Sequence, residues 1–370
     1  MTKNEGILIL MTIYLVISIS LLFMGLLYEV MNSTTTKLYR RGTPKLFFII
    51  PSFILLFFIS TYRGDFTTDY INYSNLFHTY NYYSFSDIFT AGFYQEIGYV
   101  FLNKLIGVFS TNEIYLFAVT TLIILFGFYH HISRYSVNIW LSILMFVTVG
   151  SYYTSFNITR QILAASIIFF GSRFLYERKF FKFVLIVILA SLFHKTALIM
   201  IPFYFILNFR IRFSNIFFVL IGSSLVFYFF QDLLYLLQNL GIYDNYTDSS
   251  YGMTGASVAN AVLPIAFALF AIIHSKKLDS KNNNMHRIWF NATIFYAVIN
   301  TLSLQIQMIE RLSYFFAPYS LLLIPFLFSK MKDKNLRFIY MMVLIALLII
   351  YNYAILVDSV FDPYYFIWDK

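Results

Sequence analysis

Long apolar segments, separated by short polar stretches, repeat along almost the whole chain, as in the run from Leu336 to Val357. About 20 consecutive apolar residues in a helix span the ~30 Å hydrocarbon layer of a membrane. Backbone groups in lipid must be hydrogen-bonded within the segment, which favours helices. The pattern predicts an all-α, polytopic transmembrane helical bundle of about 12 spans, near residues 6–28, 46–62, 113–130, 137–152, 160–176, 180–193, 196–209, 214–230, 257–275, 288–306, 312–329 and 336–357.

Two longer stretches interrupt this pattern and are predicted to be outer loops, near residues 63–112 and 231–256. Within the first, Glu96 to Ser110 is short and contains Lys104. Its apolar residues recur at helical spacing, which predicts an amphipathic helix on the outer surface rather than another span: Ile97, Phe101, Leu105 and Val108. No domain linker or internal repeat is evident, so residues 1–370 are predicted to form a single integral membrane domain.

The basic residues set the predicted orientation. Cytoplasmic loops of membrane proteins are enriched in lysine and arginine. With the amphipathic segment kept out of the membrane, five basic clusters fall on one side, near residues 37–45, 173–182, 210–212, 276–287 and 330–337. That side is predicted to be the cytoplasm, which leaves both termini outside. The first apolar run lacks a basic leader and a small-residue cleavage site, so it is interpreted as a retained span.

Composition excludes several classes of function. Hydrophobic residues make up 60% of the chain and charged residues only 12%, too few for a water-soluble surface. There are no cysteines, and the six histidines lack ligand spacing, so we expect no metal site. No phosphate-binding glycine loop or dinucleotide motif occurs, so we expect no cofactor. The net charge of +9 follows membrane topology and does not indicate nucleic acid.

Two polar groups lie at predicted outer helix ends. Arg63 begins the first, where Asp65 and Asp69 would share a helix face, and a guanidinium suits phosphate or carboxylate. The ordinary alternative is a snorkelling arginine before a solvated acidic loop. The second group comprises Asn157, Arg160 and Gln161 at i, i+3 and i+4, which a helix would present together. Its alternative is a helix cap beside a snorkelled arginine.

Two further groups lie on the same predicted side. His194 and Lys195 occupy a tight turn, where histidine transfers protons near neutral pH and lysine neutralises anions. Glu310 and Arg311 begin another span. A polar turn and an interfacial ion pair are the ordinary alternatives. Taken together, the outer cations predict an anion site that suits a diphosphate on a lipid carrier, with nearby acids available as general bases.

These motifs, in this order, resemble the EpsG-like family of bacterial polysaccharide polymerases, which is related in role to the Wzy O-antigen polymerases. The resemblance runs from about Ile49 to Phe316. It is carried by Arg63 with Asp69-Tyr70-x-x-Tyr73, by Glu96-x-Gly98-Tyr99, by Ser155-Phe156-Asn157-x-x-Arg160-Gln161-x-x-Ala164 and by His194-Lys195-x-Ala197.

The resemblance implies a multi-pass protein of the bacterial inner (cytoplasmic) membrane. Its substrates would be oligosaccharide units on undecaprenyl diphosphate, within membrane lipid, with a flippase and a chain-length regulator as further partners. A growing glycan would pass to another lipid-linked unit and release undecaprenyl diphosphate. Arg63, Arg160 and Arg311 would bind phosphate, and Asn157, Gln161 and Lys195 would complete the substrate contacts. The base or acceptor-sugar contacts would be drawn from Asp69, Glu96 and His194, whose order the sequence leaves open.

Three other activities remain as alternatives. A flippase for the same lipid-linked sugar would need cations through the bilayer centre, whereas these arginines gather at outer helix ends. An O-antigen-type ligase is chemically close to the polymerase. An O-acyltransferase would need an acyl donor from the cytoplasmic side, which the outer position of the polar motifs disfavours.

Overall fold

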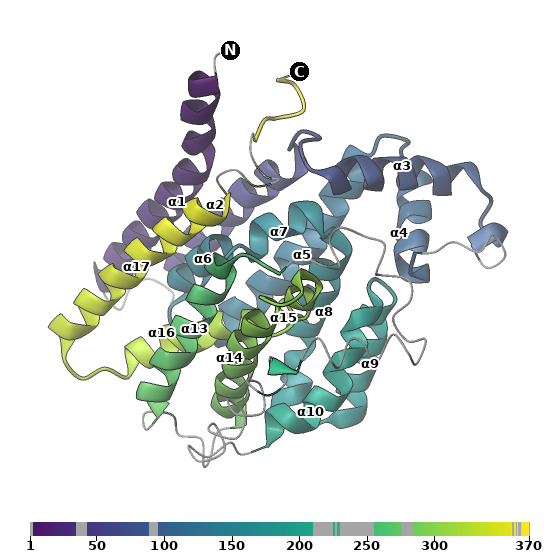
Figure 1. The fold of residues 1–370 in the computed structure, drawn as a ribbon. Helices are drawn as coiled ribbons and strands as arrows, with labels where there is room; N and C mark the ends of the chain where they lie inside the picture. Colours follow the sequence, from purple (N-terminus) through teal and green to yellow (C-terminus); the bar gives the residue numbers. More distant parts are fainter. Residues whose placement is uncertain are drawn as a thin grey trace.

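A computed structural model describes residues 3–34, 43–88, 95–209, 225, 228–229, 255–275, 278, 284–356, 359, 361 and 364–369. Helices dominate these residues (Figure 1). The α-helices are α1 (Lys3–Thr34), α2 (Thr43–Thr61), α3 (Thr68–Tyr82), α4 (Ile97–Gly107), α5 (Ile114–Tyr135), α6 (Ile139–Thr148), α7 (Ser151–Asn157), α8 (Thr159–Tyr176), α9 (Phe180–Ser191), α10 (Met200–Asn208), α13 (Val258–Ile273), α14 (Asn284–Leu302), α15 (Glu310–Ser313), α16 (Ala317–Ser329) and α17 (Lys334–Leu356). The described 3-10 turns are η1 (Ser86–Ile88), η2 (Lys195–Ile199) and η5 (Gln307–Ile309).

The all-α prediction is confirmed for the described residues, but the predicted number of about 12 spans is not. Every predicted span except 214–230 overlaps a described helix; that range and the loop 231–256 lie almost wholly outside the described residues. Three described helices are long and apolar enough to cross a membrane, or up to five if two bent pairs each form one crossing. Several others are short: α9, with 12 residues, is about 18 Å long.

Bends account for part of this difference. α6 and α7 meet at 42°, and the stretch Gln307–Ser313 meets α16 at 56°. The first bend is at Gly150, whose φ of 94° lies in the left-handed region that glycine tolerates. The first bend falls within the single predicted run 137–152, so the chain changes direction inside a segment that the sequence presents as one apolar run.

The core of the bundle is built around α6 and α16. Every residue of α6 is buried, as is every residue of α16 from Ala317 to Phe328. α1 and α17 lie at the edge, and α17 exposes one apolar face that includes Phe338, Val343 and Ile350. Since α17 also buries apolar residues on its inner side, it is apolar all round, which is typical of a helix that contacts a membrane.

α3 and α4 lie together at one end of the bundle, on the side where both termini lie (Figure 1). The predicted amphipathic segment does form a helix, α4, and its apolar stripe is exposed; Val108, for example, is 63% exposed. Lys104 lies on the buried face, where its ammonium donates to the carbonyl of Tyr83. That α4 rests on the outer membrane surface stays a prediction.

The C-terminal residues 364–369 form a strap across the end of α2. The amide of Gly64 donates to the carbonyl of Tyr365 at 2.7 Å, and the amide of Ile367 donates to the carbonyl of Tyr62 at 3.1 Å. The hydroxyl of Tyr364 donates to the carbonyl of Ile59 at 2.9 Å. The strap therefore fixes the chain leading from α2 into α3.

Candidate substrate cavity

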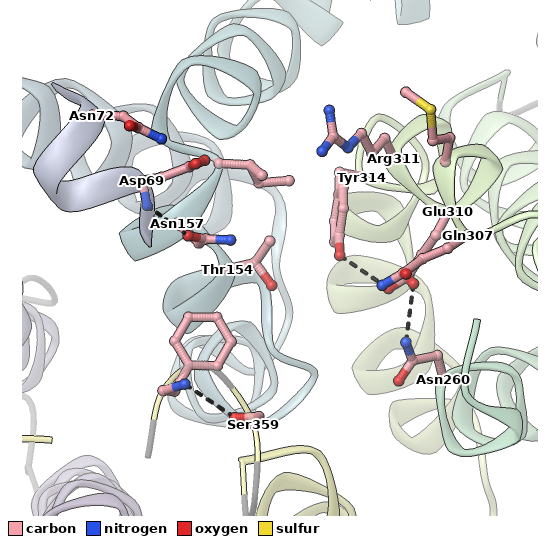
Figure 2. Close-up of a pocket in the computed structure, with 13 residues that line it drawn as sticks. Asp69, Asn72, Thr154, Asn157, Asn260, Gln307, Glu310, Arg311, Tyr314 and Ser359 are labelled. Atoms are coloured by element: carbon pink, nitrogen blue, oxygen red, sulfur yellow. Dashed lines mark hydrogen bonds between the residues drawn. The ribbon is translucent and has the colours of Figure 1, made fainter. Parts of the chain in front are cut away.

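A cavity of about 740 Å³ opens between the start of α3, the end of α7 and the η5–α15 turn. Figure 2 shows its two facing walls, one carrying Asp69 and Asn157 and the other Glu310 and Arg311. This volume lies within the usual range for ligand sites, about 300–1,000 Å³. The described lining residues are Asp69, Asn72, Thr154, Asn157, Ile158, Asn260, Gln307, Met308, Glu310, Arg311, Tyr314, Ser359 and Phe361.

Asp69 is positioned by the first turn of α3. Thr67 caps this helix, and its hydroxyl accepts a hydrogen bond from the amide of Tyr70 at 3.3 Å. The same hydroxyl donates to the carbonyl of Phe156 at 3.3 Å, and the amide of Asp69 donates to Oδ1 of Asn157 at 3.4 Å. These contacts join α3 to α7. An acid in the first helical turn is also favoured by the helix dipole.

The surroundings of Asp69 suit a proton acceptor. Burial raises the pKa of this carboxyl, while a hydrogen bond from Asn72 and the charges of Arg311 and Arg160 partly offset that effect. A raised pKa makes a carboxylate a stronger base nearer neutral pH. Burial also raises the pKa of Glu310, but hydrogen bonds from neighbouring side chains engage both oxygens of that carboxylate, so Asp69 is the stronger candidate for the base.

The opposite wall of the cavity carries the carboxylate of Glu310, which is fixed by hydrogen bonds, and the guanidinium of Arg311. Glu310 accepts hydrogen bonds at 3.0 Å from the amide of Asn260 and at 3.0 Å from the hydroxyl of Tyr314. Gln161 donates through Nε2 to the carbonyl of Arg311. Because Gln161 is only 2% exposed, it supports the backbone of α15 instead of reaching the cavity.

A second cluster is centred on Glu96. Its Oε2 lies 2.6 Å from Nη1 of Arg160, and its Oε1 accepts a hydrogen bond from the amide of Lys195 at 3.1 Å. Nδ1 of His194 lies 3.4 Å from Oε1, and the guanidinium of Arg160 lies 5.6 Å from the centre of the Tyr99 ring. Four of the predicted site residues thus meet: Glu96, Arg160, His194 and Lys195.

Glu96 is a poor candidate for the base. Burial opposes its charge, but hydrogen bonds from His194 and from the amide of Lys195, with the charge of Arg160, lower its pKa to about 2. A carboxylate with so low a pKa holds a proton weakly. In addition, Glu96 is not among the described residues that line the cavity, whereas Asp69 is.

Arg63 lies apart from both groups. It is 2% exposed, and its guanidinium donates to the carbonyls of Ser60 and Phe156, the latter at 3.5 Å. Three aromatic rings surround it, those of Phe117 at 4.5 Å, Phe156 at 5.1 Å and Tyr70 at 5.6 Å. Arg63 does not line the cavity. Its partners are those of a residue that fixes the junction of α2, α3 and α7.

Several cavity residues were not singled out by the sequence analysis, among them Asn72, Thr154, Asn260 and Tyr314. Asn72 lies three residues after Asp69, so helical spacing offered a signal for it. Tyr314 follows Glu310 by four residues and contacts it, a second signal of the same kind. Asn260 comes from α13, and nothing in its local sequence connects it with Glu310.

The long apolar helices α1, α5 and α17 are those of a membrane protein. The family model of the EpsG family matches residues 45–367, and the chain belongs to that family. The resemblance inferred from the motifs is thereby confirmed, and the match extends beyond Phe316 into the C-terminal strap. No curated protein and no solved structure matches the chain.

Proposed function

We propose that the protein is a polysaccharide polymerase, a membrane glycosyltransferase of the bacterial inner membrane. It transfers a growing glycan from undecaprenyl diphosphate to a lipid-linked repeat unit on the outer face. The bond between the anomeric carbon and the phosphate oxygen breaks, and a bond from that carbon to an acceptor hydroxyl forms. The acceptor hydroxyl loses its proton, and undecaprenyl diphosphate leaves with the electron pair.

One observation carries this proposal: Asp69 and Arg311 line the same cavity from opposite walls (Figure 2). A guanidinium binds a diphosphate through paired, charge-assisted hydrogen bonds. A carboxyl with a raised pKa accepts the proton of a sugar hydroxyl. The reaction needs both groups at one site, one for the leaving diphosphate and one for the acceptor.

The other predicted residues have supporting roles in this proposal. Asn157 lines the cavity and contacts the backbone of Asp69, so it positions the base and offers an amide to the sugar. Arg160 adds positive charge that acts on Asp69, while Glu96 holds its guanidinium. His194 and the backbone amide of Lys195 contact Glu96 and so help to hold it against Arg160.

The test uses purified protein in lipid nanodiscs, supplied with its native undecaprenyl-diphosphate repeat unit and no nucleotide. Products are separated on a gel. A ladder from the parent protein, lost in Asp69→Asn and weakened in Arg311→Ala, is the expected result. Glu177→Gln is the matched control because this carboxylate is exposed in the turn between α8 and α9.

The opposite outcomes separate the alternatives. No ladder, together with movement of the lipid-linked unit between leaflets, would favour a flippase. Transfer only to a different acceptor would favour a ligase. A ladder that survives both cavity substitutions would leave a polymerase whose chemistry lies elsewhere.

A further inference from the structure

A second cavity, of about 370 Å³, lies beside α3 and at the start of α5. Ligand sites of this size are common, with typical volumes of about 300–1,000 Å³. Its described lining residues are Gly64, Asp65, Tyr70, Ile71, Ser74, Asn112, Glu113, Ile114 and Ile367. None of them lines the larger cavity.

α3 lies between the two cavities. Asp69 and Asn72 line the larger one, whereas Tyr70, Ile71 and Ser74 line the smaller one. This division follows from helical periodicity, since residues three or four apart share a face. A ligand in the smaller cavity would therefore touch the helix that carries the candidate base.

The two cavities differ in charge. Each is lined by two carboxylates, those of Asp69 and Glu310 in the larger cavity and those of Asp65 and Glu113 in the smaller one. The larger cavity also contains the guanidinium of Arg311, whereas none of the described residues lining the smaller one is a lysine or arginine. The smaller cavity presents the carboxylates of Asp65 and Glu113, which repel phosphate and accept hydrogen bonds from hydroxyl groups. Its polar groups thus suit the sugar part of a lipid-linked substrate and not its diphosphate.

These polar groups are held in place by their neighbours. Asp65 accepts a hydrogen bond from the hydroxyl of Tyr365 at 2.7 Å, and Glu113 lies 3.4 Å from Nε2 of His78. Oδ1 of Asn112 accepts from the amide of Ile114 at 2.9 Å, and its Nδ2 group, which carries two N–H donors, has no partner among the residues that the structure describes. Donors and acceptors that are fixed before binding reduce the entropy cost of holding a sugar.

The C-terminal strap contributes one apolar residue, Ile367, to the wall of this cavity. Ile367 lines the cavity, and its two neighbours, Phe366 and Trp368, stack with ring centres 4.8 Å apart. Trp368 is 56% exposed. These rings pack on Phe58 of α2 and on Tyr62 just after it, which anchors the strap, so Ile367 is held as an apolar wall beside the polar groups of the cavity.

We infer that the smaller cavity is a second carbohydrate-binding site, which holds an uncharged sugar unit of the glycan away from the diphosphate. This inference rests on the proposed function for the identity of the ligand as a glycan. In the polymerase, the site would keep one end of a glycan chain against α3 while the reacting end occupies the larger cavity.

The experiment measures binding without catalysis. The full-length protein in nanodiscs is titrated with lipid-free, phosphate-free oligosaccharides, prepared by partial hydrolysis of the surface polysaccharide of the source bacterium. Saturation-transfer NMR gives the Kd. We expect Glu113→Gln and Ser74→Trp each to raise the Kd at least tenfold, the first by removing an acceptor and the second by filling the cavity. The exposed Thr79→Trp, on the same helix, is the matched control and leaves the Kd unchanged.

Other results of the binding experiment would overturn the inference. Absence of binding by the parent protein overturns the inference, as does binding that Glu113→Gln and Ser74→Trp leave intact in folded protein. A Kd raised by Asp69→Asn and not by Glu113→Gln would move the sugar to the larger cavity and also overturn it. The ladder assay is independent: binding without a ladder contradicts the polymerase proposal alone, and a ladder without binding contradicts this inference alone.

Discussion

The carboxylate of Glu96 lies 2.6 Å from the guanidinium of Arg160, although 64 residues separate them in the sequence. The same carboxylate accepts the amide of Lys195 and lies 3.4 Å from His194. One acidic residue therefore joins the chain before α4, the start of α8 and the turn before η2. Residues that the sequence suggested as separate chemical groups meet around one carboxylate, that of Glu96, which is ion-paired with Arg160.

Replacement of Glu96 by glutamine is expected to destabilise the protein by about 1.5–3 kcal/mol at neutral pH, the usual contribution of a hydrogen bond to a charged group. The pKa of Glu96 is lowered to about 2 in the folded protein, from 4.5. Its stabilising effect is therefore complete above about pH 4.5 and is lost as the pH falls towards 2. Melting temperatures of the two proteins between pH 3 and 7 measure the difference.

The gap between the two melting curves should narrow as the pH falls, because protonation removes the same charge that the substitution removes. Glu177→Gln serves as the control, since that carboxylate is exposed and its ion pairs are screened by solvent. A gap that is constant from pH 7 to pH 3 would contradict the assigned cause.

Replacement of Asp69 by asparagine is expected to lower kcat by about 10²–10⁴-fold with little change in KM, the usual effect of losing a general base. Burial raises the pKa of Asp69, so the parent enzyme should lose kcat/KM on the acid side at a pH above the ordinary aspartate value of 3.8. Initial rates of ladder formation against pH give both quantities. A kcat within threefold of the parent would exclude Asp69 as the base.

Replacement of Arg311 by lysine is expected to raise KM for the lipid-linked donor by about 10–100-fold, since the charge remains but the paired donors are lost. The side chain of Arg311 is exposed and lines the cavity, while the contact from Gln161 is to its backbone carbonyl, which lysine keeps, so the fold should persist. Rates measured at several donor concentrations, with the melting temperature as a folding check, separate binding from stability. An unchanged KM would place the diphosphate elsewhere.

The fold was predictable where a long apolar run becomes one straight helix. α1 and α17 follow the predicted ranges 6–28 and 336–357 closely. The run near 137–152 was predicted to be one helix, whereas the chain bends at Gly150. Hydropathy measures how apolar a segment is and does not report the direction of the chain, so it could not predict this bend. The helical spacing of α4 was correct, but Lys104 turned inwards to a carbonyl, which spacing alone does not reveal.

The candidate site was predictable in part. Asp69, Asn157 and Arg311 were each chosen as polar residues near a helix end, and all three line one cavity. They come together because of how α3, α7 and α15 pack in the bundle. A single sequence does not give the distances between helices that are far apart along the chain. Arg63 shows why residue type alone does not identify a binding residue. A guanidinium that suits phosphate is equally suited to carbonyl groups and aromatic rings.

Replacement of Arg63 by lysine is expected to destabilise the protein by about 1–3 kcal/mol, since an ammonium cannot reach both carbonyls with the geometry of the fork and loses the stacking of the planar guanidinium on the surrounding rings. Those carbonyls belong to Ser60 and Phe156. Burial lowers the pKa of Arg63 to about 10, so the native guanidinium stays charged at neutral pH. The folded fraction should keep the KM of the parent for the lipid-linked substrate, because Arg63 does not line the cavity. Melting temperature and KM, measured on the same preparation, decide between the two roles: an unchanged melting temperature with a raised KM would make Arg63 a phosphate ligand, as its motif first suggested.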